Sequence, residues 1–307
     1  MRGGSSMTAR IAWAILSGMV CLMAGVADAA DQTTSRGVSA SSSADAGTGG
    51  RDACRRGLNA LPALRMAADD RRIIEHFHQA TTLYRRLPAE MVQCDAALLE
   101  FVLTKPETLV DVWRVLGISR VALDPTGPGC WRLADGYGTE GLVRLMHHEA
   151  GPDGSLLVFH GSGGYTGPLA PKRLTGSCLI AVRYQPVVVD GRTVQRMEVE
   201  AFLDVDGLGL ELVTRTLQPL IVRSAAANVH EICLFVSQFA SAATRNPAGM
   251  AVLAEQLPRT AAADRRMLCA LATGRRVPTP EPAAAADVSE ELAARWMTAD
   301  DLDATRR

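Results

Sequence analysis

The sequence predicts an α+β protein: N-terminal short helices, an antiparallel β-meander of about six strands, and a long C-terminal helix packed on the sheet. Two changes in hydrophobic period carry this prediction. Apolar residues recur at helical spacing over 53–117 and alternate with polar residues over 118–206. Helical spacing returns over 207–273. We therefore expect residues 53–273 to form a single α+β domain.

The N-terminal helices are each marked by an apolar face and a start signal. Asp69 and Asp70 precede apolar residues spaced for a helix that reaches Arg86. Pro88 suits the first turn of a second helix, and Pro106 suits that of a third. We expect these to be neighbouring helices with brief connections.

Turn-forming residues such as Asp190 and Gly191 separate the predicted strands. The strands are expected near 118–124, 130–134, 141–149, 155–160, 176–186 and 193–205. In the last strand, one face is apolar and the other carries charges such as Glu198 and Glu200. We expect the apolar face to meet a core and the charged face to meet water, as antiparallel sheets commonly do.

The predicted C-terminal helix has an apolar stripe that runs from Leu210 to Ala243. Pro219 is expected to kink or divide it, because proline removes a helical hydrogen bond. Asn246 and Pro247 end it. Two further helices are expected near 248–257 and 261–273.

The first 29 residues have the layout of a secretory signal peptide. The N-terminal region contains Arg2 and Arg10, and an uncharged apolar run, Ile11–Ala27, follows it. Small residues then occupy the positions that a signal peptidase recognises before its cleavage site. We expect cleavage before Ala30 and a periplasmic or extracellular protein, with a retained membrane anchor as the alternative. No later segment is apolar for long enough to form an integral membrane span.

Two segments have little to bury. Residues 30–52 are rich in Ser, Gly, Thr and Ala and predict a disordered linker. Residues 274–307 predict a Pro/Ala-rich tail with a short helix that carries Trp296.

Charge and cysteine content narrow the function classes. With a formal net charge of −1, the chain lacks the net positive charge typical of a nucleic-acid binder, so no nucleic-acid partner is expected. Six cysteines remain after cleavage, without a CxxC motif, and any disulfide pairing among them stays open. For Cys178 and Cys233, which fall on apolar faces, buried thiols are expected. The six are Cys54, Cys94, Cys130, Cys178, Cys233 and Cys269.

One motif resembles catalytic machinery. An apolar strand runs into His160–Gly164 (HGSGG), which resembles the oxyanion-hole loop of α/β-hydrolases. That fold also requires a Gly-x-Ser-x-Gly elbow downstream, which the chain lacks. We therefore prefer a glycine-rich bend that ends a strand, and keep a hydrolase as a second alternative.

Other polar groups predict no site. Asp204–Gly207 resembles the start of a calcium loop, but Leu208 and Leu210 replace oxygen ligands, so a strand-to-helix turn is expected. The histidines lack metal-ligand spacing, and Glu198 and Glu200 suit a solvated face. No catalytic residue, metal site or cofactor is expected.

The order of elements resembles the helix-grip arrangement of START-like (Bet v 1-like, polyketide-cyclase-like) domains. The resemblance covers roughly residues 70–245, with the strand-to-helix segment 203–220 typical of that fold's end. It implies a sheet wrapped around the final helix and a cavity that takes a lipid or another apolar molecule. The sequence departs from the arrangement in showing no strand ahead of the first helices.

Our hypothesis is an exported non-enzymatic protein that binds an apolar small molecule between the sheet and the C-terminal helix. A cell-envelope structural or interaction protein with a closed core is the alternative, and the oligomeric state stays open. Ala201 is small and would leave room for a ligand. The candidate pocket residues are Val199, Ala201 and Leu203 on the sheet and Leu217, Ile232, Val236 and Phe239 on the helix.

Overall fold

A computed structural model describes residues 48–151, 153–166, 174–206, 208–274 and 292, although the side chains at 174 and 208–221 lie outside that description. The α+β prediction is confirmed: a large antiparallel sheet has helices before and after it. The predicted signal peptide, Trp296 and most of the predicted linker and tail lie outside the described residues.

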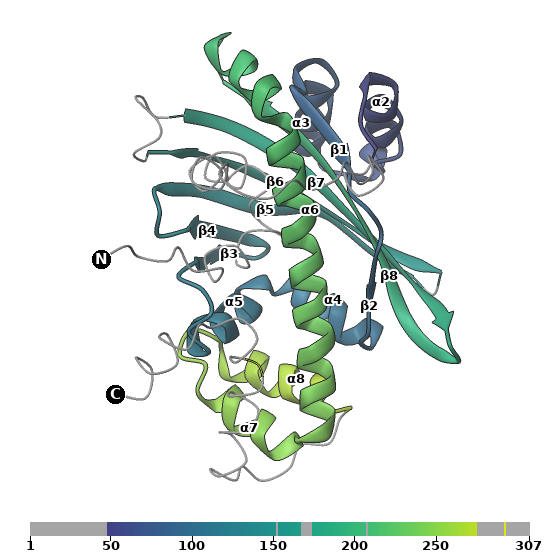
Figure 1. The fold of residues 1–307 in the computed structure, drawn as a ribbon, viewed down its shortest axis with the longest axis vertical. Coiled ribbons are helices and arrows are strands. Elements are labelled where there is room, and N and C mark those ends of the chain that lie inside the picture. The colour runs from purple at the N-terminus through teal and green to yellow at the C-terminus, as the bar shows by residue number, and fades with distance from the viewer. Residues whose placement is uncertain (1–47, 152, 167–173, 207, 275–291, 293–307) are drawn as a thin grey trace, which may run out of the picture.

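Eight strands form the sheet, and seven of them follow the order β1-β8-β7-β6-β5-β4-β3, with β2 also paired to β8 (Figure 1). The meander from β3 to β8 matches the six predicted strands. At its last hairpin, Asp190 and Gly191 have φ of 50° and 74°, the left-handed pair that a tight two-residue turn requires. The strands are β1 (Leu83–Arg86), β2 (Glu90–Val92), β3 (Ala122–Gly127), β4 (Cys130–Ala134), β5 (Thr139–Gly151), β6 (Gly154–Tyr165), β7 (Leu174–Val189) and β8 (Arg192–Val205).

Helices that precede β1 cover one face of the sheet, which we call the α3 face. They are α2 (Arg51–Asn59), a short 3-10 turn at Ala63–Arg65, and α3 (Ala68–Ala80). A compact hydrophobic cluster joins them to the sheet, with Phe77 of α3 and Phe202 of β8 both fully buried.

The opposite face, which we call the α6 face, meets the main core. The long helix α6 runs across this side of the sheet in Figure 1 and comes closest to β1 and β2. Shorter helices fill the space around its C-terminal half. The helices on this side are α4 (Ala96–Thr104), α5 (Pro106–Val115), α6 (Leu208–Arg245), α7 (Pro247–Glu255) and α8 (Ala262–Ala272).

The prediction of a helix running toward Arg86 was wrong beyond Ala80, and the helix predicted to open at Pro88 begins only at Ala96. α3 ends at Ala80, and the next residues form β1 and β2, both paired antiparallel with β8. Without them, β8 would present an open edge of unpaired backbone groups. β1 and β2, which are distant from β8 in the sequence, form hydrogen bonds with these groups. β1 therefore supplies a strand ahead of α4 and α5, which the sequence did not reveal.

The expectation that Glu198 and Glu200 lie on a solvated sheet face was also wrong for Glu200. That residue is 5% exposed, because α2 and α3 cover the face. The Tyr84 hydroxyl donates to Glu200 over 2.7 Å, and Arg183 forms an ion pair with the same carboxylate. A buried charge needs such partners, since desolvation alone would make it costly.

Two further local predictions need correction. Gly161–Gly164 lie inside β6, which continues to Tyr165, so they do not form a bend that ends a strand. α6 passes through Pro219 as one helix, so the expected division does not occur, and the alternative, a kink, stays a prediction. The predicted stop is confirmed, because α6 ends at Arg245 and the Asn246 side chain accepts a hydrogen bond from the Gly249 amide at the start of α7.

Candidate functional site on the α6 face of the sheet

The three sheet residues predicted to line a pocket point to the α6 face. Val199 and Leu203 of β8 belong to the main hydrophobic core and are 7% and 4% exposed. Ala201 lies between them on the same face, yet it is only partly buried. Solvent therefore reaches the sheet at a point flanked by two buried side chains.

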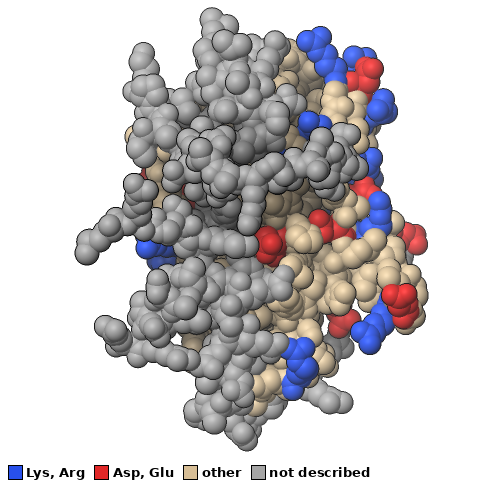
Figure 2. Space-filling model, viewed as in Figure 1, with Lys and Arg blue, Asp and Glu red and all other residues tan. Residues whose placement is uncertain are grey.

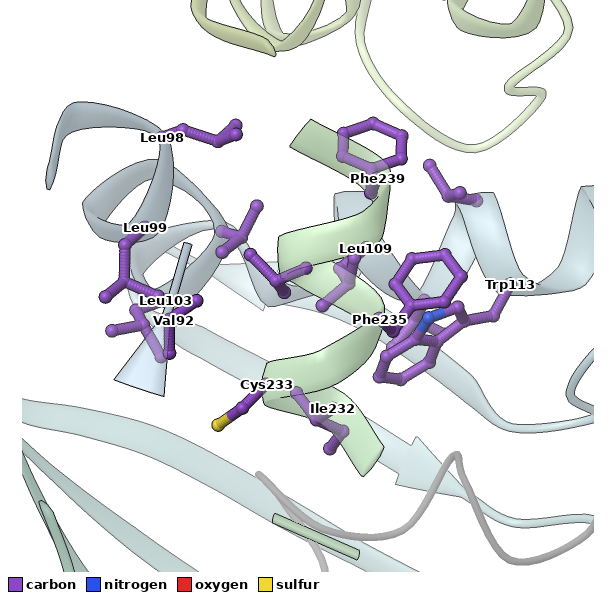
Figure 3. Close-up of a cluster of buried hydrophobic side chains, with 14 of the residues drawn as sticks. Val92, Leu98, Leu99, Leu103, Leu109, Trp113, Ile232, Cys233, Phe235 and Phe239 are labelled. Carbon is purple, nitrogen blue, oxygen red and sulfur yellow. The ribbon is translucent and has the colours of Figure 1, made fainter. Parts of the chain in front are cut away.

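The C-terminal half of α6 is closed core. The predicted residues Ile232, Val236 and Phe239 are each at most 2% exposed. Around them, Phe235 meets Trp113 edge-on, with ring centroids 5.9 Å apart, and aliphatic residues of α4 fill the other side (Figure 3). This half of the helix leaves no open space beside these residues, and the side chain of Leu217 lies outside the described residues.

Three glycines form a row across neighbouring strands on the α6 face. Gly141 of β5 pairs with Gly163 of β6, and Gly163 pairs with Gly176 of β7. All three are partly exposed, and the row continues to the buried Val205 of β8. These three adjacent positions carry no side chain toward the α6 face, and we call them the glycine row.

The backbone explains why two of these positions hold glycine. A Cβ atom at Gly141 would lie 2.7 Å from the Ser162 carbonyl oxygen, and one at Gly176 would lie 2.6 Å from the Asp204 carbonyl oxygen. Such close approach between strands is typical of glycine positions where a sheet bends. In the next row, a Cβ at Gly161 would lie 2.9 Å from the Cys178 sulfur.

Sequence reasoning missed the glycine row, although a signal for it was present. The glycines at 161 and 163 alternate with His160 and Ser162, so their strand face is readable from the two-residue period. Gly141 and Gly176 could be added only with the strand register known, because pairing decides which glycines become neighbours.

The arrangement at His160–Gly164 does not build an oxyanion hole. β6 pairs with β5 on one side and β7 on the other throughout this segment, so its backbone groups belong to the sheet ladder. Ser162 is exposed on the α3 face, opposite the glycines. His160 packs edge-on against Phe77, and burial, the largest cause, lowers the pKa of its imidazole.

A polar trio lies at the other end of the α6 face. Glu100 of α4 accepts a hydrogen bond from the Tyr184 hydroxyl over 3.1 Å, and its second oxygen lies 3.2 Å from Nε2 of His148. Burial raises the pKa of Tyr184 to about 12, so this phenol is neutral near pH 7. The trio fixes the β5–β6–β7 end of the sheet to α4.

The remaining titratable groups form neither a metal-binding cluster nor a redox pair among the described residues. Among the described residues, no group of three or more His, Cys, Asp or Glu side chains is placed to hold a metal ion. Cys54, Cys94, Cys130, Cys233 and Cys269 are free thiols, and Cys233 is buried as predicted. Burial raises the pKa of the Cys94 thiol to about 12, which keeps it protonated and poorly nucleophilic.

The described surface mixes charges of both signs along one margin in Figure 2, and no large patch of a single sign is visible in this view. No helix in the described part of the chain is long and apolar enough to cross a membrane.

Comparison with known proteins gives distant likenesses. No family model and no curated protein matches the chain. Among solved structures, a conserved protein from Geobacillus kaustophilus is 11% identical with a TM-score of 0.30, over 49% of this chain and 93% of its own. An uncharacterized protein from Rhizobium leguminosarum is 13% identical with a TM-score of 0.25, over 48% and 94%. Ara h 8.0201 is 9% identical with a TM-score of 0.24, over 48% and 98%.

Proposed function

We propose that this chain is an exported, non-enzymatic protein that binds an apolar small molecule on the α6 face of its sheet. The observation that carries the proposal is the glycine row together with the partly exposed Ala201. A sheet face that is otherwise packed into a core stays partly exposed at these positions, and apolar walls with a few polar groups are typical of ligand pockets.

The topology supports a helix-grip arrangement as the frame of this site. β1 and β2 precede two short helices, α4 and α5, and both pair with the last strand. α6 then begins at Leu208, directly after β8. This is the order that the START-like resemblance implies, with α2 and α3 added on the far face.

The small side chains of α6 support the same location. Ala225 and Ala226 pack against the main core but stay partly exposed, whereas Phe235 and Phe239, further along the helix, are fully buried. The ligand site therefore lies toward the N-terminal half of α6 and the glycine row, away from the closed half.

Ligand binding is tested with a neutral apolar fluorophore, N-phenyl-1-naphthylamine, titrated into the purified protein. We expect saturable binding that Ala201→Leu weakens at least tenfold, because the added side chain fills the space. Ser162→Leu is the matched control, since it places the same side chain at an exposed position on the α3 face. Absence of saturable binding, or equal binding by both variants, would favour a structural protein with a closed core.

Export is tested separately from binding. The chain is expressed with its N-terminus intact in a bacterium that has a periplasm, and the fractionated protein is sequenced from its N-terminus. We expect a mature chain that begins at Ala30 in the soluble exported fraction. An uncleaved chain in the membrane fraction would instead identify residues 11–27 as an anchor.

A further inference from the structure

A single arginine stands on the α6 face at the edge of the sheet. Leu83 of β1 packs against the main core, and Tyr84 belongs to the cluster on the α3 face. Because strand side chains alternate, Arg85 points to the α6 face. Its partner across the ladder is Ala201, the partly exposed residue of the proposed site.

Arg85 lacks the partners that the other arginines near it possess. Its Nε atom is buried and has no hydrogen-bond partner, and among the described residues no carboxylate forms an ion pair with its guanidinium. The adjacent Arg86 forms an ion pair with Glu198 on the α3 face over 2.6 Å. Arg144 and Arg183 are paired in the same way with Asp70 and Glu200.

An unpaired guanidinium in this position favours an anion. Arginine stays protonated at all physiological pH values, and a buried donor without a partner carries a desolvation cost. A carboxylate matches its planar donors and can accept two parallel hydrogen bonds. The charge is therefore complementary to a ligand that carries one acidic group.

The residues around Arg85 indicate how such a ligand would lie on the sheet. A Cβ atom at Gly49 would be 2.8 Å from Nη1 of Arg85, so the guanidinium rests against the backbone at the rim of the sheet. Inward from the rim come Ala201 and then Ile180 in the same row. The neighbouring row on the way to the glycine row holds Leu83, Leu203, Cys178 and Gly161.

We propose that Arg85 binds the carboxylate of a single-chain amphipathic acid, of the fatty-acid class, whose hydrocarbon chain passes over Ala201 toward the glycine row. This inference rests on the proposed function, because it assumes an apolar ligand on the α6 face. It adds the polar end of that ligand and the residue that recognises it.

The test compares two ligands that differ only in charge, decanoate and decanol, each titrated calorimetrically below its aggregation limit. The proteins are the wild type, Arg85→Gln, Arg85→Lys and Arg86→Gln. We expect wild-type protein to bind decanoate more tightly than decanol. Arg85→Gln should weaken decanoate binding about tenfold or more, the size of a lost charge-assisted hydrogen bond, and leave decanol binding unchanged.

The two arginine controls separate charge from position. Arg85→Lys keeps the charge without the fork of donors and should retain part of the preference for decanoate. Arg86→Gln removes the neighbouring charge on the opposite face and should leave both affinities at the wild-type value. Decanol binding by Arg85→Gln shows that this variant is folded. If the variant does not fold, the role of Arg85 is judged from the preference of the wild type for decanoate and from its partial retention in Arg85→Lys.

The experiment distinguishes failure of the proposed function from failure of the role assigned to Arg85. If wild-type protein binds neither ligand, the proposed function fails and the inference falls with it. If it binds both ligands equally well, or if a folded Arg85→Gln keeps the preference for decanoate, the apolar site stands and the role of Arg85 is overturned.

Discussion

The two faces of the sheet are both covered by helices, yet they differ in what the cover does. On the α3 face, Arg144 is paired with Asp70 and Arg183 with Glu200, and Nε2 of His76 lies 2.7 Å from the Asp204 carboxylate. On the α6 face, the sheet packs into the main hydrophobic core, includes the glycine row, and bears an arginine without a described partner. The arginines of the first face form ion pairs, although Nη2 of Arg183 lacks a described partner, whereas the second face is partly exposed and bears an arginine without an ion pair in the described part of the chain.

This difference indicates that one face of the sheet contributes mainly to stability, whereas the other is suited to binding. Where the α3 face is packed under helices and its arginines are paired, it gains stability from that cover. A face with missing side chains forgoes some of that stability, since empty space loses packing contacts. Substitutions on each face can show whether stability and ligand binding separate between the faces in this way.

The largest effect is expected from opening the α3 face. Phe77→Ala removes a fully buried ring that packs under α3 and should lower the free energy of unfolding by about 3–5 kcal/mol. Urea denaturation measures the change. Phe77 lies on the opposite face from the proposed site, so any variant that remains folded should bind the apolar probe with wild-type affinity. A large loss of affinity in folded protein would argue against the separation of the faces.

A matched pair of alanines on adjacent strands compares the space on the two faces directly. Ala181 is fully buried on the α3 face, so Ala181→Leu should destabilise the protein by about 1–3 kcal/mol through overpacking. Ala201→Leu enters partly exposed space and should change the free energy of unfolding by less than about 0.5 kcal/mol. Equal destabilisation by both would mean that the α6 face is as closed as the α3 face.

The glycine row is tested by adding one methyl group. Gly176→Ala places a Cβ against the Asp204 carbonyl oxygen, and we expect about 1–2 kcal/mol of destabilisation as β7 and β8 move apart. Gly127→Ala in β3 is the control, because nothing lies within 4 Å of its added Cβ. Thermal denaturation compares the two. A harmless Gly176→Ala would show that the row is not needed for the path of the strands.

The smallest effect is a pH dependence that originates on the α3 face. Burial lowers the pKa of His160 in the folded protein below its value of about 6.5 in an unfolded chain. The unfolded state therefore binds a proton more readily than the folded state. The contribution of His160 to the free energy of unfolding is fully present above the unfolded-state pKa and is lost as the pH falls through the folded-state pKa.

His160→Gln should flatten the dependence of unfolding free energy on pH between about 7.5 and 5 relative to wild type. His78→Gln, at an exposed position on α3, is the control and should keep the wild-type slope. An unchanged slope in His160→Gln would assign the pH dependence to other groups.

Periodicity and turn residues were sufficient to predict the meander, the change from strand to helix between Val205 and Leu208, and the helix stop at Asn246. They could not predict β1, because its residues also fit helical spacing and its strand conformation depends on the edge of β8. The burial of Glu200 was missed for a related reason, since the helices that cover it come from a distant part of the chain. The predicted apolar face of β8 does point toward α6, while its lining of a pocket stays a prediction, and nothing local could distinguish the closed half of α6 from the rest.

The pairing of β1 with β8 also has a consequence for the order of folding. Tyr84 of β1 and Glu200 of β8 are 116 positions apart in the chain, and the sheet edge closes only when they meet. Non-local pairings of this kind slow folding, because the loop entropy is lost before the contacts form. β1 emerges from synthesis well before its partner exists, so the N-terminal helices and β1 must wait unpaired until the last strand is made.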